Sequence, residues 1–147
     1  VASRGLGDVY KRQSQQRIND LIEREIERGI LAEHIVLAGF SQGCAMTLQT
    51  GLRYPQPLAG LMCLSGYLPL ADTIAEERHA ANQNVPIFMA HGRGDGVVLI
   101  NRAEASRDHL QSLGYTIEWH EYLMQHSVCA EEIDDISRWL QRVLKAH

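Results

Sequence analysis

The sequence is poor in the features that mark several classes of protein. Its three cysteines, Cys44, Cys63 and Cys129, are an odd number, lie far apart and include no CxxC motif. This pattern predicts reduced cytoplasmic thiols packed as small hydrophobic side chains. The formal net charge is −4 and Lys and Arg form no cluster, so nucleic acid and anionic membrane surfaces are not expected as partners. No apolar run approaches the roughly 20 residues of a membrane-spanning helix.

What is present has the composition of an ordinary globular protein. The 147 residues are 45% hydrophobic and 22% charged, which excludes a disordered chain and suffices for one domain with a buried core. The sequence contains no internal repeat and no low-complexity linker. A single domain is therefore expected.

The first residues differ from the rest. The stretch SRGLGDVYKRQ, residues 3–13, has no hydrophobic period and no capping residues before the helix that follows. It resembles, residue for residue, one reading frame of a transposase-type DNA sequencing adapter. We therefore expect residues 1–13 to be an artefactual or disordered tail, and residues 14–147 to form the domain. The gene fragment would then begin in mid-protein, at about Ser14.

From Ser14 onward, helical and strand patterns alternate. The first helix is indicated by apolar residues at i, i+3, i+4 and i+8, from Ile18 to Ile26, and Gly29 ends it. The strands are apolar throughout, which is typical of a parallel sheet covered on both faces. We predict an α/β fold with about four mainly parallel strands flanked by helices. The predicted helices cover residues 14–29, 42–54, 100–113 and 130–146, with short helical structure within 71–84, and the strands cover 35–39, 58–64, 86–91 and 116–122.

One strand runs directly into the motif Gly39-x-Ser41-x-Gly43, which then enters a helix. A glycine on each side of the serine permits a sharp turn that projects the hydroxyl group, as in a nucleophile elbow. The helix that starts at Gln42 directs free N–H groups toward a developing oxyanion. The motif also arises by chance in loops, so a structural serine is the alternative.

A nucleophilic serine needs a base and an acid that orients it. In this architecture the acid and then the base follow the serine in the sequence, each at the carboxyl end of a later strand. Asp95 lies four residues after His91 among glycines, and His126 lies between the fourth strand and the last helix. A turn aspartate and a surface histidine are the alternatives. Together and in this order, Ser41, Asp95 and His126 predict a catalytic triad.

Other candidates fit less well. His91 precedes the acid, and His120 lies within an alternating strand, where it is expected to face solvent or to pack. His120, Glu121 and His126 lack a third ligand at suitable spacing, so no metal is expected. Cys44 points along a helix and is expected to fill space.

The blocks GFSQGCAM, LSGYLPL, PIFMAHGRGDGVV and EWHEYLMQHSVCAEEI resemble the carboxylesterase and acyl-protein thioesterase family of α/β-hydrolases, from residue 14 to the end of the chain. The resemblance implies that Ser41 is the nucleophile, Asp95 the acid and His126 the base. It also implies that the amide of Gln42 is one of two oxyanion donors. Family members hydrolyse carboxylic esters without a cofactor, some act on thioesters or lysophospholipids, and most are cytosolic.

This chain departs from the family at several positions. It has Cys44 where the family usually has Gly, Gly96 where it has Pro, and Leu123-Met124-Gln125 where it has Pro-x-Gly. Relatives also begin with several more strands and an H-G-x-G-type loop that supplies the second oxyanion donor. Nothing similar precedes Ser41 here, so a partial α/β-hydrolase fold without its N-terminal strands is expected. The strand at residues 35–39 would then be an exposed edge, which predicts a homodimer or higher oligomer.

The predicted function is that of a cytoplasmic serine carboxylesterase acting on short- to medium-chain esters through an acyl-enzyme. A catalytically impaired fragment, or a thioesterase, lysophospholipase or other hydrolase on the same fold, is the alternative. A small-molecule ester is the expected partner. The candidates for the acyl pocket border the triad loops and have core packing as an equal alternative; they are Leu68, Val97, Val98 and Met124.

Overall fold

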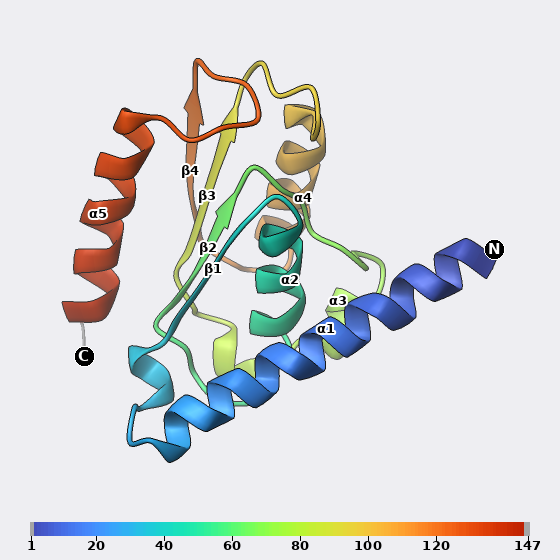
Figure 1. Cartoon of the computed structure of the whole chain (residues 1–147), viewed down its shortest axis with the longest axis vertical. Helices are drawn as coiled ribbons and strands as arrows, with labels where there is room; N and C mark the ends of the chain where they lie inside the picture. Colours follow the sequence, from blue (N-terminus) through green and yellow to red (C-terminus); the bar gives the residue numbers. More distant parts are fainter. Residues whose placement is uncertain (1, 146–147) are drawn as a thin grey trace.

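The computed structural model describes residues 2–145 of the chain, so Val1, and Ala146 at the end of the last predicted helix, lie outside the described residues. Four strands form one sheet in the order β1-β2-β3-β4, and all neighbours are parallel. Figure 1 shows their carboxyl ends pointing in one direction. This confirms the predicted parallel sheet. The strands are β1 (Val36–Phe40), β2 (Gly60–Leu64), β3 (Ile87–Gly92) and β4 (Ile117–Tyr122).

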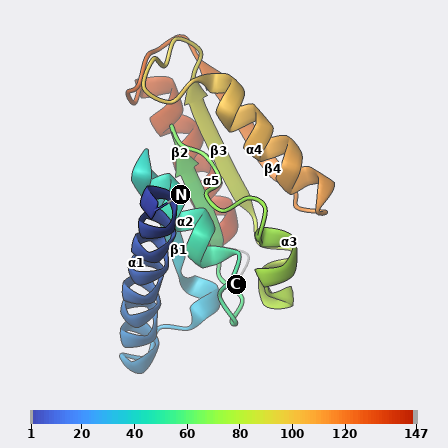
Figure 2. The ribbon, with the colours of Figure 1, turned by 90° about the vertical axis from the view of Figure 1, so that its right-hand side faces the viewer.

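Helices cover both faces of this sheet (Figure 2). Side chains of α1, α2, α3 and α4 belong to the core on one face, whereas α5 packs on the other. Short 3-10 helices at Ala32–His34 and Ala80–Asn82 lie in the connections. The α-helices are α1 (Ala2–Glu27), α2 (Gln42–Gly51), α3 (Ile74–Glu77), α4 (Ile100–Ser112) and α5 (Ala130–Lys145).

The two cores follow from the alternation of side chains along each strand. In β2, Leu61 and Cys63 face the larger core beneath α2, while Met62 faces α5. In β3, Phe88 faces Trp139 of α5, with ring centroids 5.7 Å apart. Because both faces are covered, β2 and β3 are largely apolar along their length, and this is the pattern that predicted them. The expectation of apolar strands throughout does not hold for the edge strand β4, which is only partly buried and includes Glu118, His120 and Glu121.

Most element boundaries lie within one or two residues of the prediction. The second helix is an exception, since it ends at Gly51 and not at Tyr54. The amides of Arg53 and Tyr54 bond to carbonyls three residues back, those of Thr50 and Gly51. The last turn therefore has the hydrogen-bond spacing of a 3-10 helix. It ends before Pro55, which cannot donate a backbone hydrogen bond.

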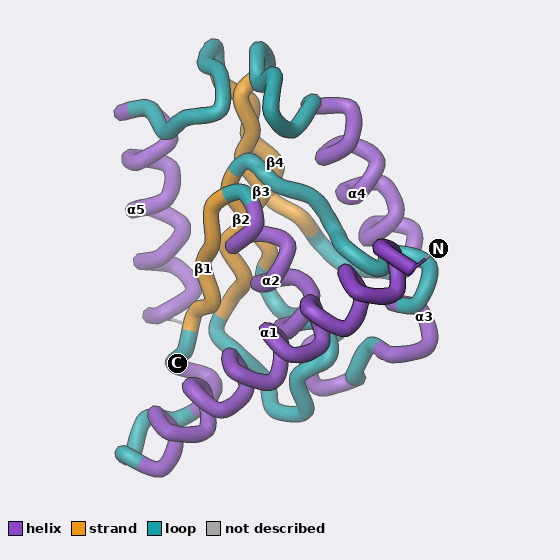
Figure 3. The backbone as a smooth tube through the Cα atoms, turned by 45° about the vertical axis from the view of Figure 1, so that its right-hand side comes forward, coloured by secondary structure: helices purple, strands orange, loops and turns teal. Residues whose placement is uncertain are grey.

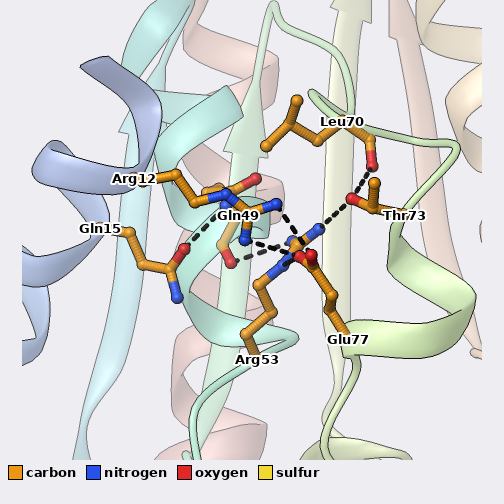
Figure 4. A network of polar contacts seen from close by, with 7 residues as sticks. All are labelled: Arg12, Gln15, Gln49, Arg53, Leu70, Thr73 and Glu77. Carbon is orange, nitrogen blue, oxygen red and sulfur yellow. Dashed lines mark hydrogen bonds and ion pairs between the residues drawn. The ribbon is translucent and has the colours of Figure 1, made fainter. Parts of the chain in front are cut away.

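The first helix begins at Ala2, twelve residues before the predicted start. No proline interrupts residues 2–13, so the helix continues without a break into the amphipathic part. A polar network joins it to α2 and α3 (Figure 4): Gln49 of α2 donates to Gln15 at 2.7 Å, and Arg12 pairs with Glu77 of α3 at 2.7 Å. Glu77 also accepts from Arg53. The tail is thus helical in this structure, while its foreign origin stays a prediction.

The described helices include none that is both long and apolar enough to cross a membrane.

Candidate active site

The three loops with the predicted triad lie at one edge of the sheet. Because all four strands are parallel, their carboxyl ends meet there, and the connections that follow them gather above it (Figure 3). Ser41 directly follows β1, Asp95 lies three residues after β3, and His126 lies four residues after β4. Parallel topology therefore places the loops that carry Ser41 and His126 at one edge of the sheet, although these residues are 85 positions apart in the sequence.

Ser41 occupies the strained turn between β1 and α2. Its backbone has φ 59° and ψ −114°, a conformation that non-glycine residues rarely adopt. A Cβ on Gly39 would lie 2.1 Å from the backbone of Gly43, so only glycine fits at this position. The amide of Ser41 donates to the carbonyl of Leu64 at 2.8 Å, which holds the turn on β2. This is the geometry of a nucleophile elbow.

The loop after β2 packs directly against the elbow. A Cβ on Gly66 would lie 2.7 Å from the carbonyl oxygen of Ser41 and equally close to Sγ of Cys44. Cys44 itself is fully buried in the core, as expected for a space-filling side chain. Ser65 has a positive φ of 56°, and within the described residues its buried hydroxyl has no hydrogen-bond partner. The turn that presents Ser41 is therefore supported by a second tight turn.

Asp95 is buried and its two carboxylate oxygens have different partners. Oδ1 accepts hydrogen bonds from the amides of Val97 and Val98, each at 2.8 Å. Oδ2 lies 2.7 Å from Nδ1 of His126. Since a carboxylate only accepts, Nδ1 of His126 carries the hydrogen and donates it.

The electrostatics of this pair keep the carboxyl group ionised. Burial works to raise the pKa of Asp95, but the hydrogen bonds from His126 and from the amides of Val98 and Val97 outweigh it. The pKa of Asp95 is therefore lowered from its ordinary value. An ionised Asp95 can orient His126 and stabilise a positive charge on its ring.

His126 lies next to the elbow as well as next to the acid. Its ring centroid is 4.8 Å from that of Phe40, the residue that precedes Ser41. The imidazole is partly exposed, whereas the carboxylate behind it is buried. His126 thus lies between the buried acid and the turn that carries the serine.

The N-terminus of α2 lies beside the elbow, with Gln42 as its first residue. The amide of a first helical residue has no partner within the helix and is free to bind an anion. A cavity of about 210 Å³ lies here, and the first half of α1 lines its other side. The segment with the adapter resemblance therefore covers part of the approach to Gln42. The lining residues are Gly7, Tyr10, Lys11, Gln42, Gly43, Ala45, Met46 and Tyr67.

The four candidates for an acyl pocket are in different environments. Leu68 and Val98 are buried, and Leu68 belongs to the core beneath α2. Val97 is 72% exposed beside the acid loop. Met124 packs against the core beneath α5. Of the four, Val97 alone presents a large apolar surface to solvent.

His120, which was considered from the sequence, lies outside the predicted triad. His120 of β4 bonds to Glu118 at 2.8 Å and stacks on Phe88, so it packs within a surface network.

Within residues 2–145, no group of three or more His, Cys, Asp or Glu side chains could hold a metal ion.

Sequence reasoning gave no role to two residues that contact members of the predicted triad. Phe40 contacts His126, and His91, rejected as the base, is buried beside Asp95. Their positions in the sequence could have indicated these contacts. Phe40 lies inside the glycine–serine motif, and His91 lies near the end of β3.

The sheet order, the elbow and the histidine–aspartate pair together define an α/β hydrolase. The crystal structure of SOBER1 from Arabidopsis thaliana superposes with a TM-score of 0.87 and 31% identity, over 91% of this chain and 64% of that one. The structure of esterase PE8 gives a TM-score of 0.76 at 28% identity, over 83% of this chain and 56% of that one.

The chain belongs to the phospholipase/carboxylesterase family, which matches residues 10–144. Acyl-protein thioesterase 1 of Yarrowia lipolytica is 40% identical over 136 residues, covering 90% of this chain and 60% of that protein. Carboxylesterase SOBER1 of Arabidopsis thaliana is 33% identical over 131 residues, covering 88% of this chain and 58% of that protein. The chain thus spans little more than half the length of these relatives.

Proposed function

We propose that the chain is a serine hydrolase that cleaves short- to medium-chain carboxylic esters through an acyl-enzyme. The observation that carries this proposal is the hydrogen bond of 2.7 Å between His126 Nδ1 and Asp95, beside a serine in a strained strand–helix turn. A buried, ionised acid, an oriented imidazole and a serine hydroxyl are the parts that acyl transfer needs.

The sequence of steps follows from the proton positions. Because Nδ1 of His126 donates to Asp95, the other ring nitrogen is free to accept the proton of Ser41 as Oγ attacks the ester carbonyl. The same proton then passes to the departing alcohol. Water activated by His126 attacks the acyl-enzyme and releases the acid.

The amide of Gln42 is the oxyanion donor in this scheme, in line with its place at the start of α2. The chain offers no counterpart of the family's H-G-x-G-type loop before Ser41. Loss of one oxyanion donor typically lowers the rate on the order of 10²–10³-fold. For the 147-residue chain assayed by itself we therefore expect measurable but low turnover, and a catalytically impaired fragment is the alternative.

Thioesters are the second substrate class. Relatives that are 40% identical to this chain carry the name acyl-protein thioesterase 1. Large apolar side chains that are exposed on the triad loops, Phe40, Val97 and Leu123, would suit the acyl part of either substrate. A cytoplasmic location belongs to the same proposal, because all three cysteines are free thiols.

The test is hydrolysis of p-nitrophenyl butyrate and of a butyryl thioester by the purified chain, beside Ser41→Ala. The proposal expects release of product that is lost in the variant for both substrates. Equal rates for the two proteins would overturn it. The ratio of the two kcat/KM values decides between ester and thioester as the preferred class.

We also infer that β1 associates with a second copy of the chain. Among the described residues β1 pairs only with β2, and Ala38 and Phe40 are exposed on it. An apolar open edge is a template for another strand. Light scattering at micromolar concentration should give a dimer or larger species, and Ala38→Lys should shift it toward the monomer. A wild-type monomer would contradict this inference.

A further inference from the structure

His91 is a buried titratable side chain that the proposed mechanism does not use. It is the penultimate residue of β3 and only 1% exposed. Burial of an imidazole is costly unless its polar atoms have partners. Its partners therefore indicate why a histidine occupies this position.

One nitrogen of His91 contacts two groups of the acid loop, which is defined here as residues 92–98. Nε2 lies 2.7 Å from the carbonyl oxygen of Val98. Because a carbonyl only accepts, Nε2 carries the hydrogen and donates it. The same nitrogen lies 3.5 Å from Oδ2 of Asp95, the oxygen that also accepts from His126. The N–H of His91 thus faces both the loop backbone and the carboxylate.

These contacts connect the orientation of the acid to His91 through Val98. The amides of Val97 and Val98 hold Oδ1 of Asp95, each at 2.8 Å. The peptide group after Val98 is in turn held by His91. With the loop fixed at this point, Oδ2 stays directed toward Nδ1 of His126. Loss of the donor would leave the buried carbonyl of Val98 unpaired, which is unfavourable, and the loop could relieve this by shifting.

We propose that His91 is a positioning residue, which fixes the acid loop so that Asp95 stays in line with His126. This role rests on the proposed triad. This role explains why a hydrogen-bond donor lies at the end of β3. If the position only filled space, an apolar side chain of similar volume would be sufficient.

Two substitutions distinguish the role of His91 as a hydrogen-bond donor from a role in which its ring only fills space. In His91→Gln the side-chain amide nitrogen reaches about as far from Cα as Nε2 and can still donate to Val98. His91→Phe keeps an aromatic ring but has no donor. For p-nitrophenyl butyrate, His91→Phe should lower kcat at least about tenfold with KM nearly unchanged, since the interaction acts on the catalytic groups. His91→Gln should restore kcat to within about threefold of wild type. Equal kcat values for the two variants, or a better rate for Phe, would overturn the proposal.

Nitrogen-15 NMR of the histidine rings gives a readout that needs neither activity nor a folded His91→Phe. The proposal requires the Nε2–H tautomer of His91 in the wild-type chain, and an unchanged His126 Nδ1–H signal in His91→Gln. An Nδ1–H tautomer at His91 would overturn it, even if His91→Phe fails to fold. An inactive wild-type chain or an active Ser41→Ala would instead overturn the proposed function. The NMR result for His91 would still decide its contact with the acid loop.

Discussion

Nδ1 of His126 donates a hydrogen bond of 2.7 Å to Oδ2 of Asp95, across 31 positions of the sequence. The carboxylate of Asp95 is fully buried, while the imidazole is partly exposed. The pair thus couples a shielded negative charge to a ring that is partly open to solvent. This relationship determines the first prediction.

Asp95→Asn should lower kcat on the order of 10⁴-fold while KM changes little, because a neutral amide no longer selects the tautomer that frees the other nitrogen of His126. Steady-state hydrolysis of p-nitrophenyl butyrate measures both constants. Asp134→Asn on the exposed face of α5 removes the same charge and serves as the control. A kcat within tenfold of wild type for Asp95→Asn would argue against the triad.

Gly39→Ala should destabilise the chain by about 3 kcal/mol or more, because its Cβ would lie 2.1 Å from backbone atoms of Gly43 that cannot move freely. Gly96→Ala is the matched control, since nothing lies within 4 Å of a Cβ there. That variant should be neutral or stabilise by about 0.4–1 kcal/mol. Urea denaturation measures both, and equal midpoints for the two variants would refute the proposed role of Gly39 in the elbow.

Glu132→Gln should raise the Tm at pH 7 by a few degrees. Glu132 is fully buried in the first turn of α5, and within the described residues neither carboxylate oxygen has a hydrogen-bond partner. Burial raises the pKa of Glu132, and the nearby amide of Cys129 only partly offsets this. The folded state therefore binds the proton more tightly than the unfolded state, so the native glutamate costs stability as pH rises above its ordinary pKa of 4.5.

The advantage of Glu132→Gln should consequently shrink as pH falls from 7 toward 4.5. Thermal denaturation at both pH values measures it, and Glu131→Gln, at an exposed neighbour, is the control. If the difference in Tm between Glu132→Gln and wild type stayed constant with pH, ionisation of the buried Glu132 would not be the cause of the difference.

Removal of residues 1–13 should leave the domain folded, if that segment is foreign to the protein. It takes away the Arg12–Glu77 pair, whose side chains are 44% and 32% exposed, and such surface pairs contribute about 0–1 kcal/mol. Arg53→Gln removes the other, buried partner of Glu77 and should cost about 1–3 kcal/mol. Loss of the folded state on deletion alone, measured by circular dichroism, would show that the segment is integral.

The sequence predicts the sheet and its loops well because the central strands β2 and β3 are buried on both faces and every strand except β4 is followed by a polar residue. The same topology places the predicted acid and base, Asp95 and His126, at one edge of the sheet. The contacts of His91 and Phe40 could not be predicted from a local pattern. They depend on how the loops after β1, β3 and β4 are placed relative to one another. The start of α1 was missed since residues 2–13 lack a hydrophobic period.

The central claim is that Ser41 is a nucleophile activated by His126, and covalent labelling tests it most directly. A fluorophosphonate should add one phosphonyl group per wild-type chain, with a bond from Ser41 Oγ to phosphorus and loss of fluoride. Intact-mass and peptide mass spectrometry should locate this adduct on Ser41 and find none in Ser41→Ala, with strongly slowed labelling in His126→Ala. An unlabelled wild-type chain, or equal labelling of wild type and Ser41→Ala, would contradict the account.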